Sequence, residues 1–305
     1  MKRKECFTKK VLTTVLATVL CVGMMTGCGQ DGNDANADTT GNDNQVETMD
    51  TDAEICVLSR EDGSGTRDAF TELLGIMEDD VDNTTVNAEI TNSTSVMMTT
   101  VAGNEEAIGY ISLGSLDDSV KAIKVDGVEP TTDNVSNGTY TVARPFNIVT
   151  GSEISENAQD FINFIMSVEG QAIIAEEGYI SVESSTNYTA SGLTGTVTLA
   201  GSTSVAPVME VIAEKYMELN EGMTIEIQQS GSGAGITSTI EGVCDIGMSS
   251  RDLKDTEIAE GVSATKIAMD GIAVIVNNAN SIEGLTSEQI KNIFVGDVTN
   301  WSEVQ

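Results

Sequence analysis

The amino-acid sequence predicts an α/β protein with two lobes. From residue 54 onward, short runs rich in β-branched residues alternate with helical stretches, which is typical of α/β folds with parallel sheets. A length of 305 residues suits about two domains or lobes. A polar stretch of small residues, Glu183 to Gly195, predicts a linker between two halves.

Strands are expected at short apolar runs, because β-branched residues pack well on a pleated surface. These runs are ICVL (55–58), AIGYIS (107–112), FNIVT (146–150), GTVTLA (195–200), MTIEIQ (223–228) and GIAVIVN (271–277). Helices are expected over about Thr66 to Leu74, Ala158 to Glu176, Val205 to Leu219, Gly235 to Glu241 and Ser287 to Phe294.

The first 27 residues are expected to be a leader outside this fold. Five Lys and Arg residues precede an apolar stretch from Val11 to Val22, which is too short for a permanent membrane span but suits a secretory signal. The leader ends in MTGC and resembles a bacterial lipobox, which implies that Cys28 is acylated and becomes the mature N-terminus. An ordinary signal cleaved nearby, or an uncleaved anchor, stays open as the alternative.

Residues 28–53 are expected to be a disordered acidic tether. They contain almost no large apolar side chain, so they cannot bury enough surface to offset their conformational entropy. Such a tether would hold the folded part of the protein away from the membrane surface that Cys28 anchors.

The charge balance excludes several function classes. The chain has 48 Asp and Glu against 15 Lys and Arg, and a net charge of −33 leaves no basic face for nucleic acid. Without histidine, neither a Ser-His-Asp triad nor a His-ligated zinc site can be built. Five scattered cysteines without a CxxC spacing disfavour a thiolate metal site. No metal, no cofactor and no catalytic residue is therefore expected.

Three turns rich in glycine and serine each lie between a predicted strand and a predicted helix: GSTSVAP (201–207), SGSGAG (230–235) and DGSGTRDAF (62–70). At a helix start, free backbone N–H groups and the helix dipole favour an anion. Each turn alone is usually only a cap. A nucleotide P-loop is excluded because no turn ends in GK[ST], and the GxGxxG spacing of a dinucleotide site is missing.

Motifs along nearly all of residues 54–305 resemble a known family. They are VLSREDGSGTRDAF, AIGYISLGSL, RPFNIV, FINFIMSVEGQAIIAEEGYI, LAGSTSVAPVMEVIAEKY, QQSGSGAGITSTIEGVCDIGMSSRDL, MDGIAVIVN and LTSEQIKNIFVGDVTNW. Together they resemble the phosphate-binding protein of bacterial phosphate ABC transporters. The resemblance implies a two-lobed periplasmic-binding-protein-like fold of the class II type, with an anion site in the cleft between the lobes.

The order of these motifs differs from the family's order. In the family, the GSTS and GSGAG segments come first and SREDGSGT follows TNW, whereas here SREDGSGT opens the folded region and TNWSEVQ closes it. Because each segment occurs once, the chain looks circularly permuted, with the family's original termini joined through residues 183–195. A fragment of a tandem protein, or a broken gene, stays open as the alternative.

The family's lobe arrangement then implies how this chain is divided. Residues 144–272 would form one continuous lobe, which we call lobe A. Residues 54–143 plus 273–305 would form lobe B, with MDGIAV and TVARPF as the crossing strands of the hinge. Cys56 and Cys244 lie in apolar runs of opposite lobes, so we expect two buried, unbridged thiols.

The family's anion site carries over where the motifs align. The implied ligand-binding residues are Thr203 and Ser204 from GSTS, Ser232 from GSGAG, Ser250 from GMSSR, and Arg60, Ser64, Gly65 and Thr66 from SREDGSGT. Arg60 is implied to offer its bidentate fork to the oxyanion, oriented by Asp62. The alternative is a surface arginine that pairs with Glu61 or Asp62.

Ser250 is a departure from the family pattern. Better-known members carry an aspartate there, which accepts the proton of hydrogen phosphate, whereas here Ser250 is followed by Arg251. A serine can donate a hydrogen bond to a fully ionised oxyanion, which puts discrimination against sulfate in doubt. Asp62, Asp245 or Asp252 is expected to approach the cleft instead.

The implied function is that of a lipid-anchored receptor on the extracytoplasmic face of the cell membrane. It would capture inorganic phosphate and deliver it to the permease subunits of an ABC transporter. A receptor for sulfate, molybdate or tungstate, and a non-transporting fragment, are the alternatives. The site offers donors without a general base or activated nucleophile, so binding rather than catalysis is expected.

Overall fold

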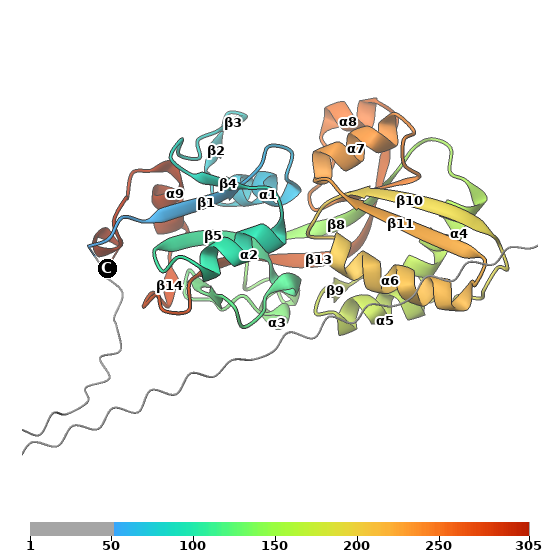
Figure 1. The fold of residues 1–305 in the computed structure, drawn as a ribbon, viewed down its shortest axis with the longest axis horizontal. Helices are drawn as coiled ribbons and strands as arrows, with labels where there is room; N and C mark the ends of the chain where they lie inside the picture. Colours follow the sequence, from blue (N-terminus) through green and yellow to red (C-terminus); the bar gives the residue numbers. More distant parts are fainter. Residues whose placement is uncertain (1–51, 305) are drawn as a thin grey trace, which may run out of the picture. The chain divides into compact units, whose positions relative to one another are not determined.

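The computed structural model describes residues 52–304, and the expected leader, Cys28 and most of the expected tether lie outside this range. The described residues form two lobes, each around its own hydrophobic core (Figure 1). Core residues of lobe A run from Phe146 to Ala268. Those of lobe B come from Ile55 to Val142 and again from Ile272 to Val304. In the described range, no helix is both long and apolar enough to cross a membrane.

Lobe A contains a sheet with helices on both faces. Its strands are β8 (Ala143–Thr150), β9 (Ile180–Ser181), β10 (Gly195–Gly201), β11 (Met223–Gln229) and β12 (Ile246–Ser249). Its helices are α4 (Glu156–Ile165), α5 (Val168–Glu176), α6 (Ala206–Leu219), α7 (Ser232–Ile240) and α8 (Asp255–Ala259). Helices α4, α5 and α6 contribute to the main core, and α7 packs on the other face through Ile236 and Val149.

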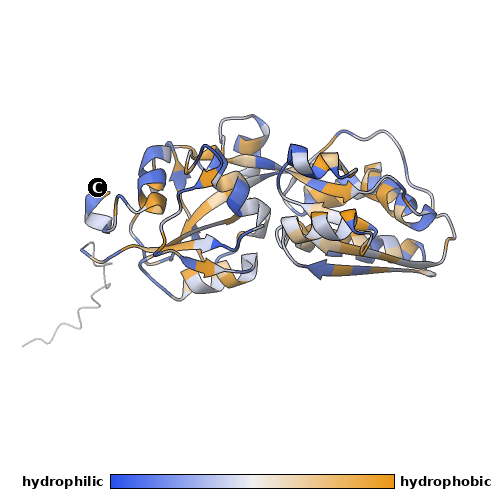
Figure 2. Cartoon of the chain, turned by 90° about the horizontal axis from the view of Figure 1, so that it is seen from above, coloured by the Kyte–Doolittle hydropathy of each residue, from blue (hydrophilic) through white to orange (hydrophobic). Residues whose placement is uncertain are grey.

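Lobe B repeats this arrangement with segments from both ends of the chain. Its strands are β1 (Cys56–Arg60), β2 (Met77–Glu78), β3 (Val81–Asp82), β4 (Glu89–Thr91), β5 (Ala107–Ser112), β6 (Lys121–Ala122), β7 (Lys124–Val125) and β14 (Gly284–Leu285). Its helices are α1 (Gly65–Leu73), α2 (Thr94–Ala102), α3 (Thr132–Ser136) and α9 (Ser287–Val295). Figure 2 shows hydrophobic residues concentrated along the strands of both lobes, whereas the helices carry hydrophilic residues as well.

One long strand, β13 (Ser263–Val276), connects the sheets of the two lobes. Its first part, Ser263–Gly271, pairs with β8, and its second part, Ile272–Val276, pairs with β5. The resulting strand order is β11-β10-β12-β8-β13-β5-β1-β4. Figure 1 shows β8 and β13 running between the lobes. The outer pairs are parallel, but β8 and β13 pair antiparallel with their neighbours, so the predicted parallel sheets are mixed sheets instead.

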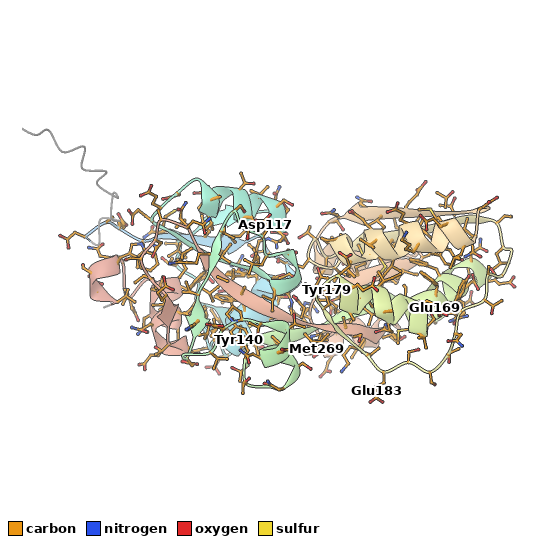
Figure 3. The ribbon with its side chains drawn as sticks, turned by 90° about the horizontal axis from the view of Figure 1, so that it is seen from below. Asp117, Tyr140, Glu169, Tyr179, Glu183 and Met269 are labelled. Atoms are coloured by element: carbon orange, nitrogen blue, oxygen red, sulfur yellow. The ribbon has the colours of Figure 1, made fainter. Side chains whose placement is uncertain are left out.

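A buried ion pair lies where the two strands cross. Arg144 of β8 donates from Nη2 to Oδ2 of Asp270 on β13 over 3.1 Å, and both side chains are buried. Burial lowers the pKa of Arg144 and raises the pKa of Asp270, and the charge of each partner opposes that shift. Figure 3 places Tyr179 and Met269 at this crossing and Tyr140 on the side of lobe B.

The predicted helix over 158–176 is two helices. The chain leaves α4 at Met166, and Ser167 caps α5 by accepting a hydrogen bond from Gly170 N over 3.1 Å. A serine inside an apolar helical pattern can start a new helix, because its hydroxyl satisfies a free N–H group. The strand predicted over 107–112 is present with the same bounds, and the other predicted strands and helices are present with shifted ends.

The predicted linker has no regular structure but is held by side chains of lobe A. Tyr188 and Ser191 of this segment donate to Oδ2 of Asp160 over 2.7 and 2.8 Å. Cys56 and Cys244 are free, which confirms the prediction of unbridged thiols. Both are only half-buried, so the expectation of two buried thiols is wrong.

Candidate anion-binding site

Helix N-termini gather where the two lobes meet. In lobe B, α1 and α2 each begin shortly after a strand, β1 and β4 respectively. In lobe A, α6 and α7 follow β10 and β11 in the same way. Parallel neighbouring strands present their carboxyl ends at the same sheet edge, and each following helix directs free N–H groups toward it. The local structure therefore suits an anion.

Polar contacts join the two lobes at this edge. The hydroxyls of Thr66 and Ser204 lie 2.9 Å apart, and both side chains are buried. Arg60 donates from Nη2 to Oγ1 of Thr203 over 3.1 Å. We call this region the lobe junction. Four of the predicted site residues, two from each lobe, therefore contact one another.

Ser232 and Ser250 lie beside Gly65 at the same junction. Ser250 N donates to Oγ of Ser232 over 3.1 Å, and the two hydroxyl oxygens are 3.3 Å apart. A Cβ atom added to Gly65 would lie 2.5 Å from Ser232 Oγ and 2.8 Å from Ser250 Oγ. Glycine is therefore required at position 65 by the close approach of the two lobes.

Ser64 is the N-cap of α1. Its hydroxyl accepts a hydrogen bond from Arg67 N over 3.4 Å, which fixes the turn that carries Gly65 and Thr66. The structure therefore places all eight predicted residues at the lobe junction, and their contact with an anion stays a prediction.

Arg60 is buried, with 2% of its side chain exposed, so the alternative of a surface arginine is wrong, although the pairing with Glu61 that it included is present. Its Nε and Nη2 atoms donate to the two carboxylate oxygens of Glu61, each over 2.8 Å. The expectation that Asp62 orients Arg60 is also wrong. The Asp62 side chain is 98% exposed and pairs with Arg67 over 2.7 Å. Glu61, directly next to Arg60, holds the guanidinium instead.

The proposed replacements for the missing aspartate do not reach the junction. Asp245 accepts from N and Oγ1 of Thr198, both over 2.8 Å, three residues before the end of β10. Asp252 and Asp62 are exposed. The expectation that one of these three approaches the site is therefore wrong. Glu61 does come near, since a Cβ atom built on Gly231 would lie 3.6 Å from its Oε1.

Thr94 at the start of α2 was missed by sequence reasoning. Its hydroxyl lies 3.4 Å from that of Thr203 and 3.3 Å from that of Ser204. The sequence did contain a helix-start signal here, Asn-Ser-Thr directly after the short β4. Ser93 caps α2 by accepting a hydrogen bond from Val96 N over 3.2 Å. This turn contains no glycine, unlike the three glycine- and serine-rich turns that predicted the anion site, and it was therefore not identified.

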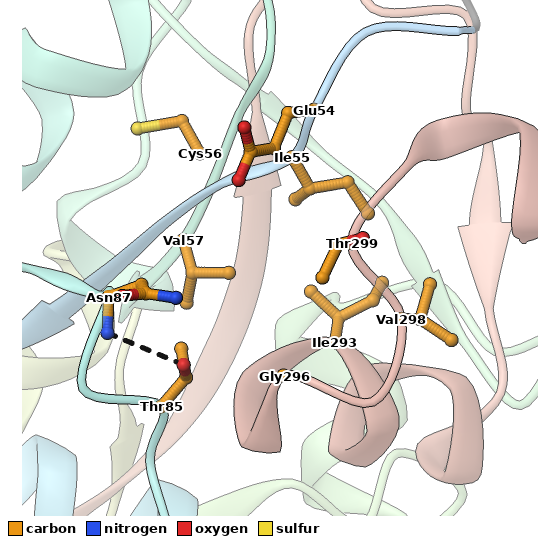
Figure 4. A pocket seen from close by; sticks show the side chains of 10 residues that line it. All are labelled: Glu54, Ile55, Cys56, Val57, Thr85, Asn87, Ile293, Gly296, Val298 and Thr299. Atoms are coloured by element: carbon orange, nitrogen blue, oxygen red, sulfur yellow. Dashed lines mark hydrogen bonds between the residues drawn. The ribbon is translucent and has the colours of Figure 1, made fainter.

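A separate pocket of about 290 Å³ lies in lobe B between β1 and the C-terminal end of α9 (Figure 4). It is lined by Glu54, Cys56 and Thr85 among others, and no Lys or Arg lines it. Burial and the nearby Glu89 raise the pKa of the Cys56 thiol, which keeps it protonated. This pocket therefore does not suit an oxyanion, whereas the lobe junction combines one arginine with hydroxyl and backbone donors.

The fold and the junction define a two-lobed binding protein, and the comparisons agree. The family model of the PBP superfamily domain matches residues 31–169 and 186–305, so the chain belongs to the PBP superfamily. The unmatched residues 170–185 between these two parts include the start of the linker 183–195, which contacts Asp160 of lobe A.

Individual relatives show which members of this superfamily the chain resembles. The phosphate-binding protein PstS 2 of Streptococcus agalactiae is 45% identical over 303 residues, which cover 97% of this chain and 98% of that protein. The crystal structure of a phosphate-binding protein of a phosphate ABC transporter from Streptococcus pneumoniae superimposes with a TM-score of 0.67 at 45% identity. That match covers 83% of this chain and 100% of the other. The phosphate-binding protein PstS of Bacillus subtilis is 32% identical over 112 residues, covering 36% and 37% of the two chains.

Proposed function

We propose that this protein captures inorganic phosphate outside the cytoplasmic membrane and delivers it to the permease of an ABC transporter. The observation that carries the proposal is the lobe junction, where Arg60 and hydroxyls from both lobes converge at four helix N-termini. The names of the streptococcal relatives support the choice of phosphate among the oxyanions.

The donors present are sufficient for tight binding. Hydrogen bonds to a charged group contribute about 1.5–3 kcal/mol each, and a micromolar Kd corresponds to about −8 kcal/mol. Several such bonds therefore exceed the free-energy cost of association and lobe closure. The protein's net charge of −33 repels a dianion at long range, so these short contacts must provide the affinity. The carboxylate at the junction, Glu61, is held by Arg60, and among the described residues no activated nucleophile stands there, so we assign no reaction to it.

Calorimetric titration of the purified protein with phosphate at pH 7 tests this function. We expect one phosphate per chain with a micromolar or lower Kd, and a melting temperature that rises with phosphate concentration. Native mass spectrometry of protein purified without added phosphate identifies any anion that it carries. A protein that melts cooperatively but binds no phosphate would contradict the proposal.

Ser250 favours a second candidate, a receptor for another oxyanion such as sulfate, molybdate or tungstate. A buried hydroxyl in place of a carboxylate imposes no repulsion on an unprotonated dianion. The same titration with each anion distinguishes the candidates, because the transported anion should bind at least tenfold more tightly than the others.

We further propose that the chain is a circular permutant of the family, and that 183–195 joins the family's original termini. An alignment along 97% of this chain requires the same segment order in the Streptococcus agalactiae relative, whereas only about a third of the chain aligns with the Bacillus subtilis protein. This difference supports permutation over a broken gene. A chain rebuilt to start at Gly195 and to join Gln305 to Glu54 should bind phosphate equally well.

The lipid anchor at Cys28 is part of the same proposal. Lipidation at this position would keep the receptor at the membrane that contains its permease. Metabolic labelling with palmitate should mark the wild-type protein and not the Cys28→Ser variant. Label that persists in the variant would rule out this anchor.

A further inference from the structure

A cluster of ionic groups crosses the lobe junction beside the anion site. Asp68 lies in the first part of α1, in lobe B, and Arg251 follows β12 in lobe A. Nε of Arg251 is 2.8 Å from Oδ2 of Asp68, an ion-pair contact that is not aligned as a hydrogen bond, and Nζ of Lys254 is 3.5 Å from the same oxygen. Only 8% of the Arg251 side chain and 14% of the Asp68 side chain is exposed.

Arg251 has a second partner inside its own lobe. Its Nη2 and Nη1 atoms donate to the two carboxylate oxygens of Glu257 on α8 over 2.7 and 2.8 Å. Glu257 also accepts from Lys254 N over 2.8 Å. When the lobes separate, Arg251 would keep Glu257 and lose Asp68. Asp68, in contrast, would lose both of its cationic partners.

Both ends of this cluster adjoin predicted anion-binding residues. Arg251 directly follows Ser250, and Asp68 lies one helical turn after Ser64. The carboxylate therefore sits near the N-terminus of α1, where it would repel a bound anion if it were not neutralised. The cations of lobe A reach Asp68 only when the lobes are together.

We propose that Asp68, Arg251 and Lys254 form a latch between the lobes that sets how tightly the closed form holds its anion. This proposal rests on the proposed function. It assigns a role to Arg251, the residue directly after Ser250, where better-known family members carry an aspartate. Proteins of this architecture bind by closing two lobes around a ligand. A contact present only in the closed form therefore adds its free energy to the apparent affinity.

Two opposing effects decide whether removing the charge of Asp68 weakens or strengthens anion binding. Removing its charge abolishes the cross-lobe pair, which favours the open form and weakens binding. It also removes a negative charge near the anion, which strengthens binding. The pair is largely shielded from water, so its loss is expected to exceed the relief of repulsion.

The Asp68→Asn variant, which keeps the side-chain shape, tests the latch. We expect phosphate affinity to fall about tenfold, through faster dissociation, and the melting temperature of the phosphate-free protein to fall only slightly, because the latch holds only the closed part of that population together. Glu257→Gln is the matched control, because it removes an equally short partner of the same arginine within lobe A. We expect it to lower the melting temperature with and without phosphate alike and to leave the affinity within about twofold.

Small-angle scattering of the phosphate-free proteins provides a readout that needs no ligand. The radius of gyration of Asp68→Asn should exceed that of the wild type and of Glu257→Gln. Unchanged or tighter phosphate binding by Asp68→Asn, or equal losses in both variants, would overturn the latch. If the wild type binds no phosphate, the proposed function fails, and the scattering comparison still decides whether the latch holds the lobes together.

Discussion

The two lobes share an architecture but differ in what they bring to their junction. Lobe A presents neutral groups, the hydroxyls of Thr203, Ser204, Ser232 and Ser250. Its nearby arginine, Arg251, is directed to carboxylates and away from this set of hydroxyls. Lobe B contributes Arg60, whose guanidinium is held by Glu61 and reaches across to Thr203. Charge comes from one lobe and most of the hydroxyl donors from the other.

This difference implies an order of events. An anion that meets the open protein gains most from lobe B, because a guanidinium that Glu61 orients in advance is the strongest single donor at the junction. Lobe A then closes and adds short hydrogen bonds that count only in the closed form. Variants in lobe B should therefore abolish capture, whereas variants in lobe A should change selectivity or closure.

Replacement of Arg60 should have the largest effect. Arg60→Met removes at least two charge-assisted hydrogen bonds and leaves the Glu61 carboxylate facing the anion. At about 1.5–3 kcal/mol per bond, we expect a loss of at least 100-fold in phosphate affinity by calorimetry. Arg60→Lys should recover only part of this loss, because an ammonium cannot form the fork to Glu61 and still reach Thr203. Retained affinity in Arg60→Met would contradict the division of roles between the lobes.

Closure is the target of the next variant, Gly65→Ala. The new Cβ atom would lie 2.5 Å from Ser232 Oγ, so the lobes could not approach as closely, although the backbone at this helical position tolerates alanine. We expect phosphate affinity to fall about 30-fold, with unchanged stability of the phosphate-free protein. Gly103→Ala is the control, because its Cβ would meet only ordinary contacts of 3.4 Å and beyond. An affinity loss in Gly103→Ala of the same size would show that the effect is not specific to the junction.

Much of this site could be predicted from the sequence because its chemistry is local. Glycine and serine between a strand and a helix mark an N-terminus, and this signal marked three turns that the structure brings to the junction. The individual residues Thr203, Ser232 and Thr66 came from the family resemblance. What failed was the choice among neighbouring carboxylates. Glu61 and Asp62 follow Arg60 by one and two residues, so both are within reach of it along the chain, and the direction of the turn places Glu61 on the guanidinium and Asp62 on Arg67.

The fold was predictable to a similar degree and for a similar reason. Apolar runs located the central strands, but periodicity within one segment contains no information about its partner's direction. The antiparallel pairing of β8 with β12 and β13 was therefore missed, as was the extent of β13. The first residues of β13, SATK, are exposed and include no large apolar side chain, so the sequence indicated a strand only where both faces become buried.

Selectivity should respond to Ser250 in lobe A. Phosphate at neutral pH carries a proton that needs an acceptor, whereas sulfate carries none, so Ser250→Asp would place a negative charge against sulfate. We expect the ratio of the sulfate Kd to the phosphate Kd to rise about tenfold. Ser250→Ala serves as the control for loss of the hydroxyl. If the native protein binds sulfate as tightly as phosphate, the proposed substrate is wrong. If Ser250→Asp abolishes phosphate binding, Ser250 acts as a donor.

The smallest effect on binding is expected at Asp160, on the far side of the lobe A core from the α7 face. Its Oδ2 accepts from Tyr188 and Ser191 of the linker and from Tyr216 of α6, over 2.7, 2.8 and 2.7 Å. Burial, followed by the hydrogen bond to this carboxylate, raises the pKa of the Tyr188 hydroxyl, so it remains a donor throughout the neutral range.

Asp160→Asn keeps one acceptor oxygen but removes the charge that strengthens these bonds. We expect the free energy of unfolding to fall by about 1–3 kcal/mol in urea titrations, with phosphate affinity within about twofold of the wild type. The two measurements separate the stability of lobe A from its contribution to the junction. A large loss of affinity in Asp160→Asn would mean that the linker positions α6, and with it Thr203 and Ser204. In that case the joining of the family's original termini would influence the site as well as the fold.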